Sequence, residues 1–219
     1  MEEIFVPVHL SGSSGDKDRA RFRLEFGFLG QVVATMQYPE DTVIVEIGSL
    51  FGMSTITMAL VSKQEVVAID PHDGEWKTFK GTRDRRKEVG GSTLDRFVQN
   101  LEEFKVRDKV KIIQAFSRDV NWTQEDGRDI CLLFLDGSHE YEDVSRDYEY
   151  FSQFLVPNGL VAFHDYGPTT EKVMSGADGK RGVATRGFPG VNQAVNEIVE
   201  AGEIEVLGIV QTMLIGMKK

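Results

Sequence analysis

The sequence lacks the features of secreted and membrane-embedded proteins. Its 219 residues include one cysteine, so no disulfide can form within the chain, which suits a reducing compartment. No segment approaches the roughly 18 apolar residues of a membrane-spanning helix. The acidic start has no basic region ahead of an apolar stretch, as a secretion signal would have. We therefore expect a cytoplasmic protein with no membrane among its partners.

Positive charge is also scarce. Lys and Arg number 25 against 35 Asp and Glu, which gives a formal net charge of −10. Nucleic-acid binding needs a cationic surface that neutralises phosphates, so we expect no nucleic acid among the partners. The stretch 77–87, KTFKGTRDRRK, is a local exception. It is either a clamp for an acidic ligand or a solvated loop.

Internal repeats and low-complexity tracts are missing as well. A chain of this length with 41% apolar residues is typical of one globular domain that buries a sizeable core. Cys131 lies inside the apolar run DICLLFLDG. We therefore expect it to be a small core residue and not a nucleophile.

The sequence does contain an alternation of strand-like and helix-like segments. Helical spacing of apolar residues predicts helices over 18–38, 53–62, 92–104, 140–155 and 191–201. Short apolar runs, typical of strands covered on both faces, predict strands over 42–48, 65–70, 110–116, 129–136, 160–165, 203–209 and 211–217. The order indicates an α/β protein with a mostly parallel seven-stranded sheet, an antiparallel edge hairpin formed by the last two strands, and helices on both faces.

Two long polar stretches, 71–91 and 167–190, each follow the carboxyl end of a predicted strand. Ligands bind at that end of open α/β sheets, so we expect these stretches to act as lids.

A glycine turn, VEIGSLFGMST over 45–55, joins the first of these strands to its helix. It is not a dinucleotide fingerprint, because Leu50 stands where a second glycine is required. It is not a phosphate-binding P-loop, since no lysine precedes Ser54. The turn either lets a ligand lie against bare backbone at a helix N-terminus or serves packing alone. Asp70 ends the next strand about twenty residues later, where a carboxylate can bind ribose hydroxyls, which favours a nucleoside-bearing ligand.

With the motifs VEIGSLFGMST, AIDP, AFSRD and LDGSHEYEDVSRDYEYFSQFLVPNGLVAFHDY, the chain resembles class I S-adenosylmethionine-dependent methyltransferases over about 40–219. More narrowly, it resembles small bacterial O-methyltransferases, a group with macrolide-sugar O-methyltransferases and cephalosporin hydroxylase-like relatives. The resemblance implies a single-domain, Rossmann-like methyltransferase fold, in which 1–39 is an N-terminal helical segment of the same domain. It also implies that S-adenosylmethionine is the cofactor.

The resemblance assigns roles around that cofactor. Asp70 would bind the ribose, and Phe116 with Ser117 would line the adenine, although Phe116 also suits an ordinary core aromatic. The residues that would surround the methionine part are Glu46, Gly48, Ser49, Gly52 and Ser54.

Two predicted strands end in an aspartate with a histidine nearby, Asp136 with His139 and Asp165 with His164. These strands are neighbours in the sheet of the family, about 4.8 Å apart. Two adjacent carboxylates repel unless one is protonated or a cation lies between them, and Mg²⁺ or Mn²⁺ takes oxygen ligands. The resemblance agrees with a metal site on Asp136 and Asp165, joined by His164. The alternatives are that His164 orients Asp165 or packs, or that both strand ends are plain turns with surface histidines.

His139 follows Asp136 by three residues, and in this spacing the resemblance makes it the general base. It could instead be a helix-start residue or a third metal ligand.

The expected activity is O-methylation of a small hydroxylated molecule such as a sugar, polyketide or phenol, with the metal on catalytic Asp136 lowering the pKa of the hydroxyl. The competing readings are a cephalosporin hydroxylase-like enzyme and a non-catalytic cofactor-binding protein. The sequence neither predicts nor excludes a homo-oligomer.

Overall fold

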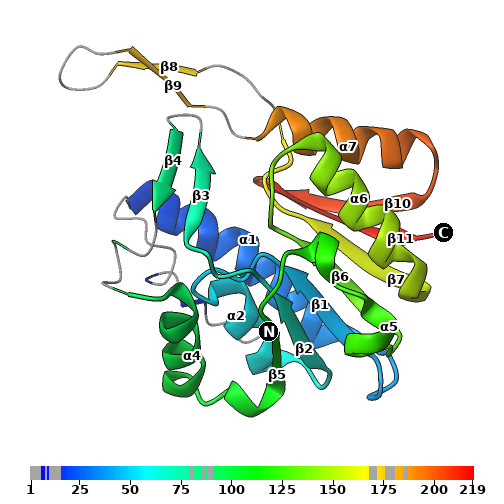
Figure 1. The fold of residues 1–219 in the computed structure, drawn as a ribbon. Coiled ribbons are helices and arrows are strands. Elements are labelled where there is room, and N and C mark those ends of the chain that lie inside the picture. Colours follow the sequence, from blue (N-terminus) through cyan, green and yellow to red (C-terminus); the bar gives the residue numbers. More distant parts are fainter. Residues whose placement is uncertain are drawn as a thin grey trace.

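A seven-stranded sheet forms the centre of the protein (Figure 1). The computed structural model describes residues 6–7, 9, 16–78, 81–84, 87, 91–167, 172–175, 181–184 and 187–219. The sheet has the strand order β10-β11-β7-β6-β1-β2-β5. Its strands are β1 Val43–Ile47, β2 Glu65–Ile69, β5 Val110–Ile113, β6 Ile130–Leu135, β7 Leu155–Phe163, β10 Ile204–Val210 and β11 Met213–Lys218.

The five strands from β5 to β7 run parallel, and β11 is antiparallel to both of its neighbours. The predicted α/β fold with an antiparallel edge hairpin is therefore confirmed. Strand β11 pairs with β7. Strand β10, which precedes β11 in the chain, therefore forms the outer edge of the sheet.

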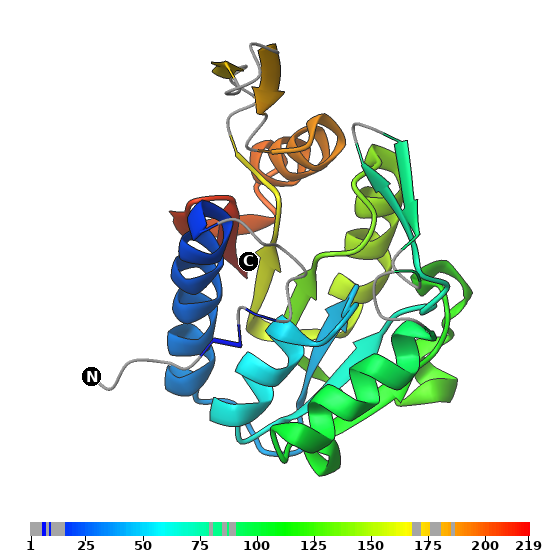
Figure 2. The same cartoon turned by 90° about the vertical axis from the view of Figure 1, so that its left-hand side faces the viewer.

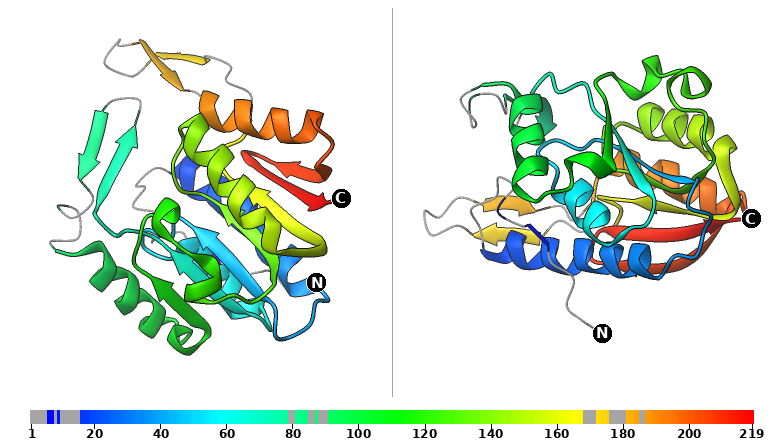
Figure 3. Two further views of the ribbon diagram at one scale, coloured as in Figure 1. Left: turned by 45° about the vertical axis from the view of Figure 1, so that its right-hand side comes forward. Right: turned by 90° about the horizontal axis from the view of Figure 1, so that it is seen from below.

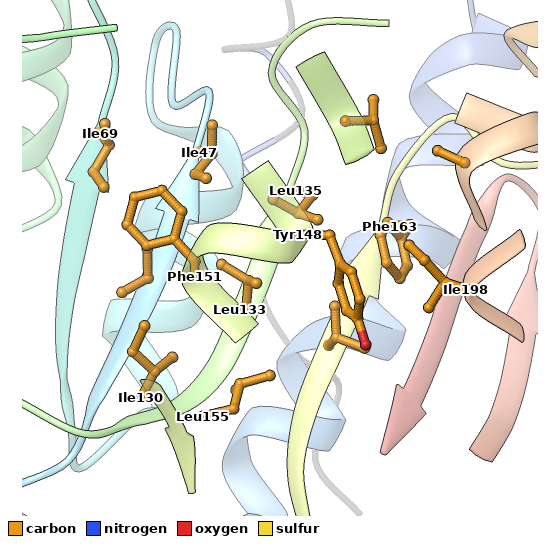
Figure 4. Packing of buried hydrophobic residues seen from close by; sticks show 14 of the residues in the cluster. Ile47, Ile69, Ile130, Leu133, Leu135, Tyr148, Phe151, Leu155, Phe163 and Ile198 are labelled. Atoms are coloured by element: carbon orange, nitrogen blue, oxygen red, sulfur yellow. The ribbon is translucent and has the colours of Figure 1, made fainter. Parts of the chain in front are cut away.

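Helices cover both faces of the sheet (Figures 1 and 3). Side chains of β1 alternate between the faces, as a strand requires: Ile44 packs in a cluster with α1, α2 and α4, whereas Val43 and Val45 pack with α5, α6 and α7. Figure 4 shows part of the second cluster. The helices are α1 Asp16–Thr35, α2 Met53–Val61, α4 Thr93–Glu103, α5 Trp122–Glu125, α6 Tyr141–Phe151 and α7 Pro189–Glu200, with short 3-10 turns η2 Arg107–Lys109, η3 Ser117–Asp119 and η4 Ser152–Phe154.

Both predicted loops contain hairpins. Strands β3 Glu75–Thr78 and β4 Gly81–Asp84 pair within 71–91, and β8 Lys172–Ser175 and β9 Arg181–Ala184 pair within 167–190. Each hairpin projects beyond the body of the sheet (Figure 1). Their four-residue strands have no apolar run, which is why the sequence pattern predicts only loops there. Within the cationic stretch 77–87, the side chains of 77–86 lie outside the described residues, so its role as a clamp stays a prediction.

The carboxyl ends of the parallel strands meet at one edge of the sheet. Gly48 follows β1, Asp70 follows β2, Asp136 follows β6, and His164 with Asp165 follows β7. The N-terminal helix α1 lies beside the C-terminal hairpin β10–β11 (Figures 2 and 3). Cys131 is buried, as expected. Of the helices in the described ranges, none has the length and apolar character to cross a membrane.

Candidate functional site

The two glycines of the β1–α2 turn are in close contact with other parts of the chain. Gly48 has a φ of 89°, and a Cβ there would lie 2.3 Å from the carbonyl oxygen of Asp136. Gly52 has a φ of 88°, and its Cβ would lie 2.9 Å from the ring of Phe97 in α4. Packing therefore requires both glycines. Their predicted contact with a ligand stays a prediction.

Asp70 holds this turn in place. Its Oδ2 accepts hydrogen bonds from the backbone N–H groups of Ser49 and Leu50, both at 2.9 Å, and its Oδ1 accepts one from His72 N–H at 2.7 Å. An ionised carboxylate has about four acceptor positions. Asp70 thus retains capacity for about one further donor, which is where a ribose hydroxyl would bind.

Glu46 lies under the same turn and is fully buried. Its carboxyl group accepts hydrogen bonds from the hydroxyls of Ser54 and Thr55 in the first turn of α2. Burial raises the pKa of Glu46 to about 8, with further increases from the charges of Asp136 and Asp70. The structure thus pairs two of the predicted cofactor residues, Glu46 and Ser54, with each other.

Ser49 has a buried hydroxyl that no described residue satisfies. A buried polar group without a partner costs free energy, which a ligand can recover. Ser49 lies on the turn that Asp70 anchors. The predicted contact of Ser49 with the cofactor stays a prediction.

The predicted adenine residues lie at the end of β5. Phe116 is 40% exposed, and the guanidinium of Arg118 lies 4.3 Å from its ring centroid. The alternative that Phe116 is a core aromatic is therefore wrong. Ser117 donates a hydrogen bond of 2.7 Å to Asp147, a buried α6 residue whose pKa is raised to about 6 by burial. Asp147 was not predicted from the sequence, and it lines a small cavity together with Asp136 and His139.

A buried imidazole lies between the carboxylates that end β6 and β7. Nδ1 of His164 is 2.9 Å from Oδ1 of Asp136 and 3.5 Å from Oδ2 of Asp165. One potential ligand atom from each of the three lies within 4.8 Å of the others. The structure thus brings together the residues predicted to bind a metal, and metal binding itself stays a prediction. Since His164 is buried, it is not a surface residue of a plain turn.

These groups shift one another's pKa values. Burial opposes the charged form of His164, but the carboxylates of Asp136 and Asp165 raise the pKa of its imidazole well above the usual value. Burial acts to raise the pKa of Asp165 too, yet the His164 charge and a His139 hydrogen bond hold it well below its ordinary value. The pKa of Asp136 is raised, chiefly by burial. A protonated His164 therefore balances the charge of the Asp165 carboxylate.

His139 lies on the other side of Asp165. Its Nε2 is 3.0 Å from Oδ2 of Asp165, and its ring stacks on Phe188 with the centroids 3.7 Å apart. His139 precedes α6, as expected from its position at the start of a helix. The structure therefore brings His139 to the strand ends, and its role as a base stays a prediction.

A third acidic residue, Glu25 of α1, reaches this cluster and was not predicted from the sequence. Its side chain is fully buried, and Oε2 lies 3.3 Å from Nε2 of His164. The hydrogen bond and charge of His164 and the charge of Arg21 keep the pKa of Glu25 below its ordinary value, although burial opposes this. Its burial could have been predicted from its position on the apolar face of the helix, three residues after Phe22 and four before Leu29.

The donor set suits a divalent cation. Carboxylate oxygens are ligands for Mg²⁺ and Mn²⁺, and an imidazole nitrogen is a ligand for transition-metal ions. Asp136, Asp165 and His164 supply both kinds of atom within one small volume.

The chain shares features with known methyltransferases. A family model described as a methyltransferase domain matches residues 45–166, more than half of the chain. The uncharacterized protein R132 of Acanthamoeba polyphaga mimivirus is 27% identical over 152 residues, which are 66% of this chain and 60% of that relative. The chain thus spans about three fifths of the length of this curated relative.

Solved structures share the fold. The O-methyltransferase TomG of Streptomyces achromogenes, involved in tomaymycin synthesis and solved with S-adenosylmethionine, has a TM-score of 0.63 at 14% identity, covering 100% of this chain and 92% of TomG. The O-methyltransferase of Bacillus cereus, solved with S-adenosylhomocysteine, has a TM-score of 0.62 at 16% identity, covering 95% and 84%. At these identities the likeness concerns the fold.

Proposed function

Because the chain belongs to the methyltransferase domain family, we propose that it transfers a methyl group from S-adenosylmethionine to a hydroxyl oxygen of a small molecule, assisted by a divalent cation. One observation carries the proposal. Ligand atoms of Asp136, His164 and Asp165 lie within 4.8 Å of one another, and Gly48 of the proposed cofactor turn touches the backbone of Asp136. The O-methyltransferases with this fold support the oxygen acceptor.

The proposed cofactor residues bind and orient S-adenosylmethionine. S-adenosylmethionine supplies an electrophilic methyl group when it is bound. Asp70 accepts a ribose hydroxyl, the Ser49 hydroxyl finds its missing partner, and the exposed face of Phe116 packs on the adenine. Glu46 lies behind the turn, where its buried carboxyl group holds Ser54 and Thr55 of α2 beside the methionine part. Positioning of the two reactants supplies most of the rate gain.

Asp136, Asp165 and His139 activate the hydroxyl oxygen of the methyl acceptor. Asp136 and Asp165 would hold the cation, which when bound would lower the pKa of the acceptor hydroxyl. His139 takes the proton from this hydroxyl. Because the carboxylate of Asp165 accepts the hydrogen bond from Nε2, the proton is taken at Nδ1 of His139.

The acceptor binds at the carboxyl edge of the sheet. The hairpins β3–β4 and β8–β9 leave this edge after β2 and β7, and we propose that they close over the acceptor and exclude water. The acceptor is a sugar, a polyketide or a phenol, since each offers the hydroxyl that the proposed chemistry requires.

Methyl transfer from labelled S-adenosylmethionine to a panel of these acceptors tests the proposal. Activity should vanish with chelator and return with Mg²⁺ or Mn²⁺. Asp136→Asn and Asp165→Asn should behave like the chelated protein while binding S-adenosylhomocysteine, because the cation serves the acceptor oxygen. Asp108→Asn, on an exposed 3-10 turn, is the matched control. Methyl transfer that chelator leaves unchanged would refute the cation, and cofactor binding without any turnover would indicate a non-catalytic binding protein.

A further inference from the structure

One carboxylate oxygen of Glu25 is hydrogen-bonded to the C-terminal hairpin β10–β11. Its Oε1 accepts hydrogen bonds from the backbone N–H of Thr212 at 2.9 Å and from the Thr212 hydroxyl at 2.7 Å. Thr212 is buried in the turn between β10 and β11. This oxygen is therefore held in place by two donors from a distant part of the chain.

The other oxygen, Oε2, faces His164. It lies 3.3 Å from Nε2 of the imidazole, and a carboxylate can only accept a hydrogen bond. Nε2 of His164 therefore carries the proton. Nδ1 is the nitrogen that faces Asp136 and Asp165.

The ring plane of His164 is fixed as well. Phe26 stacks on it with the centroids 5.3 Å apart and an interplanar angle of 25°, and Phe22 stacks at 6.4 Å. Both phenylalanines belong to α1, as Glu25 does. Helix α1 thus sets both the plane of the ring and the nitrogen that faces the carboxylates.

We propose that Glu25 is a positioning residue that makes His164 a metal ligand through Nδ1, so that the site prefers ions that bind imidazole, such as Co²⁺ and Zn²⁺, over Mg²⁺. The inference rests on the cation site of the proposed function and identifies its third ligand. A hydrogen bond from the far nitrogen to a carboxylate commonly fixes the tautomer of metal-bound histidines. Metal binding releases the Nδ1 proton to solvent, and Nε2 keeps its own.

Glu25→Gln tests this assignment with little change in volume. A glutamine side chain has one acceptor oxygen and an amide nitrogen that only donates, through two N–H groups. The donors of Thr212 take the oxygen, so the amide N–H faces Nε2 of His164 and moves the imidazole proton to Nδ1. In the variant this is the single proton of the ring, so its release to a metal at Nδ1 would leave an imidazolate, which disfavours binding.

Calorimetric titrations with Co²⁺ and with Mg²⁺, on the full chain, measure the effect. Glu25→Gln should weaken Co²⁺ binding by about 10- to 100-fold, the usual range for loss of such a partner, and change Mg²⁺ binding much less. His164→Gln should do the same, and the double variant should lose no more than either single variant, because both changes remove one interaction. Glu200→Gln, an exposed α7 residue, should match wild type.

Nitrogen NMR of the wild-type protein with Zn²⁺ gives the same answer without any variant that must fold. Nδ1 of His164 should shift to the metal-bound range while Nε2 keeps its proton. Two protonated nitrogens in the presence of bound Zn²⁺ would overturn the inference, as would equal loss of Co²⁺ and Mg²⁺ affinity in Glu25→Gln. If wild type binds neither ion, both this inference and the proposed cation fail. If ion binding and chelator-sensitive methyl transfer persist unchanged in Glu25→Gln, the inference alone fails.

Discussion

Nδ1 of His164 lies 2.9 Å from Oδ1 of Asp136, at the junction of the two strands that carry the proposed chemistry. Two adjacent carboxylates repel unless one is protonated or a positive charge lies between them. The protonated imidazole of His164 supplies such a positive charge between Asp136 and Asp165. Under the proposed metal binding, the same ring is a charge partner without the metal and becomes a ligand with it.

His139→Ala should lower turnover by about 10²- to 10⁴-fold, the usual range for a lost general base. Metal binding should persist, because His139 is not among the three residues whose ligand atoms cluster. Part of the activity should return at high pH, where the hydroxyl ionises without help. Steady-state kinetics across pH, with Co²⁺ titration beside them, check this. Loss of the metal in His139→Ala would instead make His139 a ligand.

Asp70→Ala should weaken binding of S-adenosylhomocysteine by roughly 1.5 to 3 kcal/mol, the value of a charge-assisted hydrogen bond. It should also lower the melting temperature without ligand, because the backbone N–H groups of Ser49, Leu50 and His72 lose their acceptor. Calorimetry and thermal unfolding measure the two effects separately. A lower melting temperature with unchanged affinity would leave Asp70 as an anchor of the turn alone.

Gly48→Ala should destabilise the protein more than Gly202→Ala. Both glycines have positive φ, 89° and 75°, but a Cβ at Gly48 meets the backbone of Asp136 whereas one at Gly202 meets nothing within 4 Å. The left-handed conformation costs about 1–2 kcal/mol in either variant, and overpacking adds about 1–3 kcal/mol at Gly48. Urea unfolding of both variants measures the difference, and equal losses would contradict the close approach.

Glu46 predicts a pH dependence of stability. Burial raises its pKa from 4.5 to about 8, so between these values the folded protein holds a proton that the unfolded chain releases. The contribution of Glu46 is full below 4.5 and is lost as pH rises through about 8. The free energy of unfolding of wild type should therefore fall relative to Glu46→Gln across this range. Parallel curves for the two proteins would contradict the raised pKa of Glu46.

The strand ends could be predicted from the sequence because each apolar run stops at a polar residue. Parallel strands bring those ends to one edge, so Asp70, Asp136 and Asp165 could be placed there without coordinates. The order of the hairpin strands could not be predicted, because either β10 or β11 could pair with β7.

Polar contacts between residues far apart in the chain could not be predicted from the sequence pattern. Glu25 on the apolar face of a helix indicates a buried partner, but nothing local identifies Thr212, 187 residues away, or His164. The Ser117–Asp147 pair and the packing of Gly48 on Asp136 are of the same kind. These contacts depend on which elements the fold places side by side.

Crystals grown with S-adenosylhomocysteine and Mn²⁺ would test the central claim most directly. Anomalous diffraction should locate Mn²⁺ bound by oxygens of Asp136 and Asp165, with the cofactor product against the β1–α2 turn and Asp70. Clear density for the cofactor product with no Mn²⁺ at these carboxylates would contradict cation-assisted methyl transfer at this site.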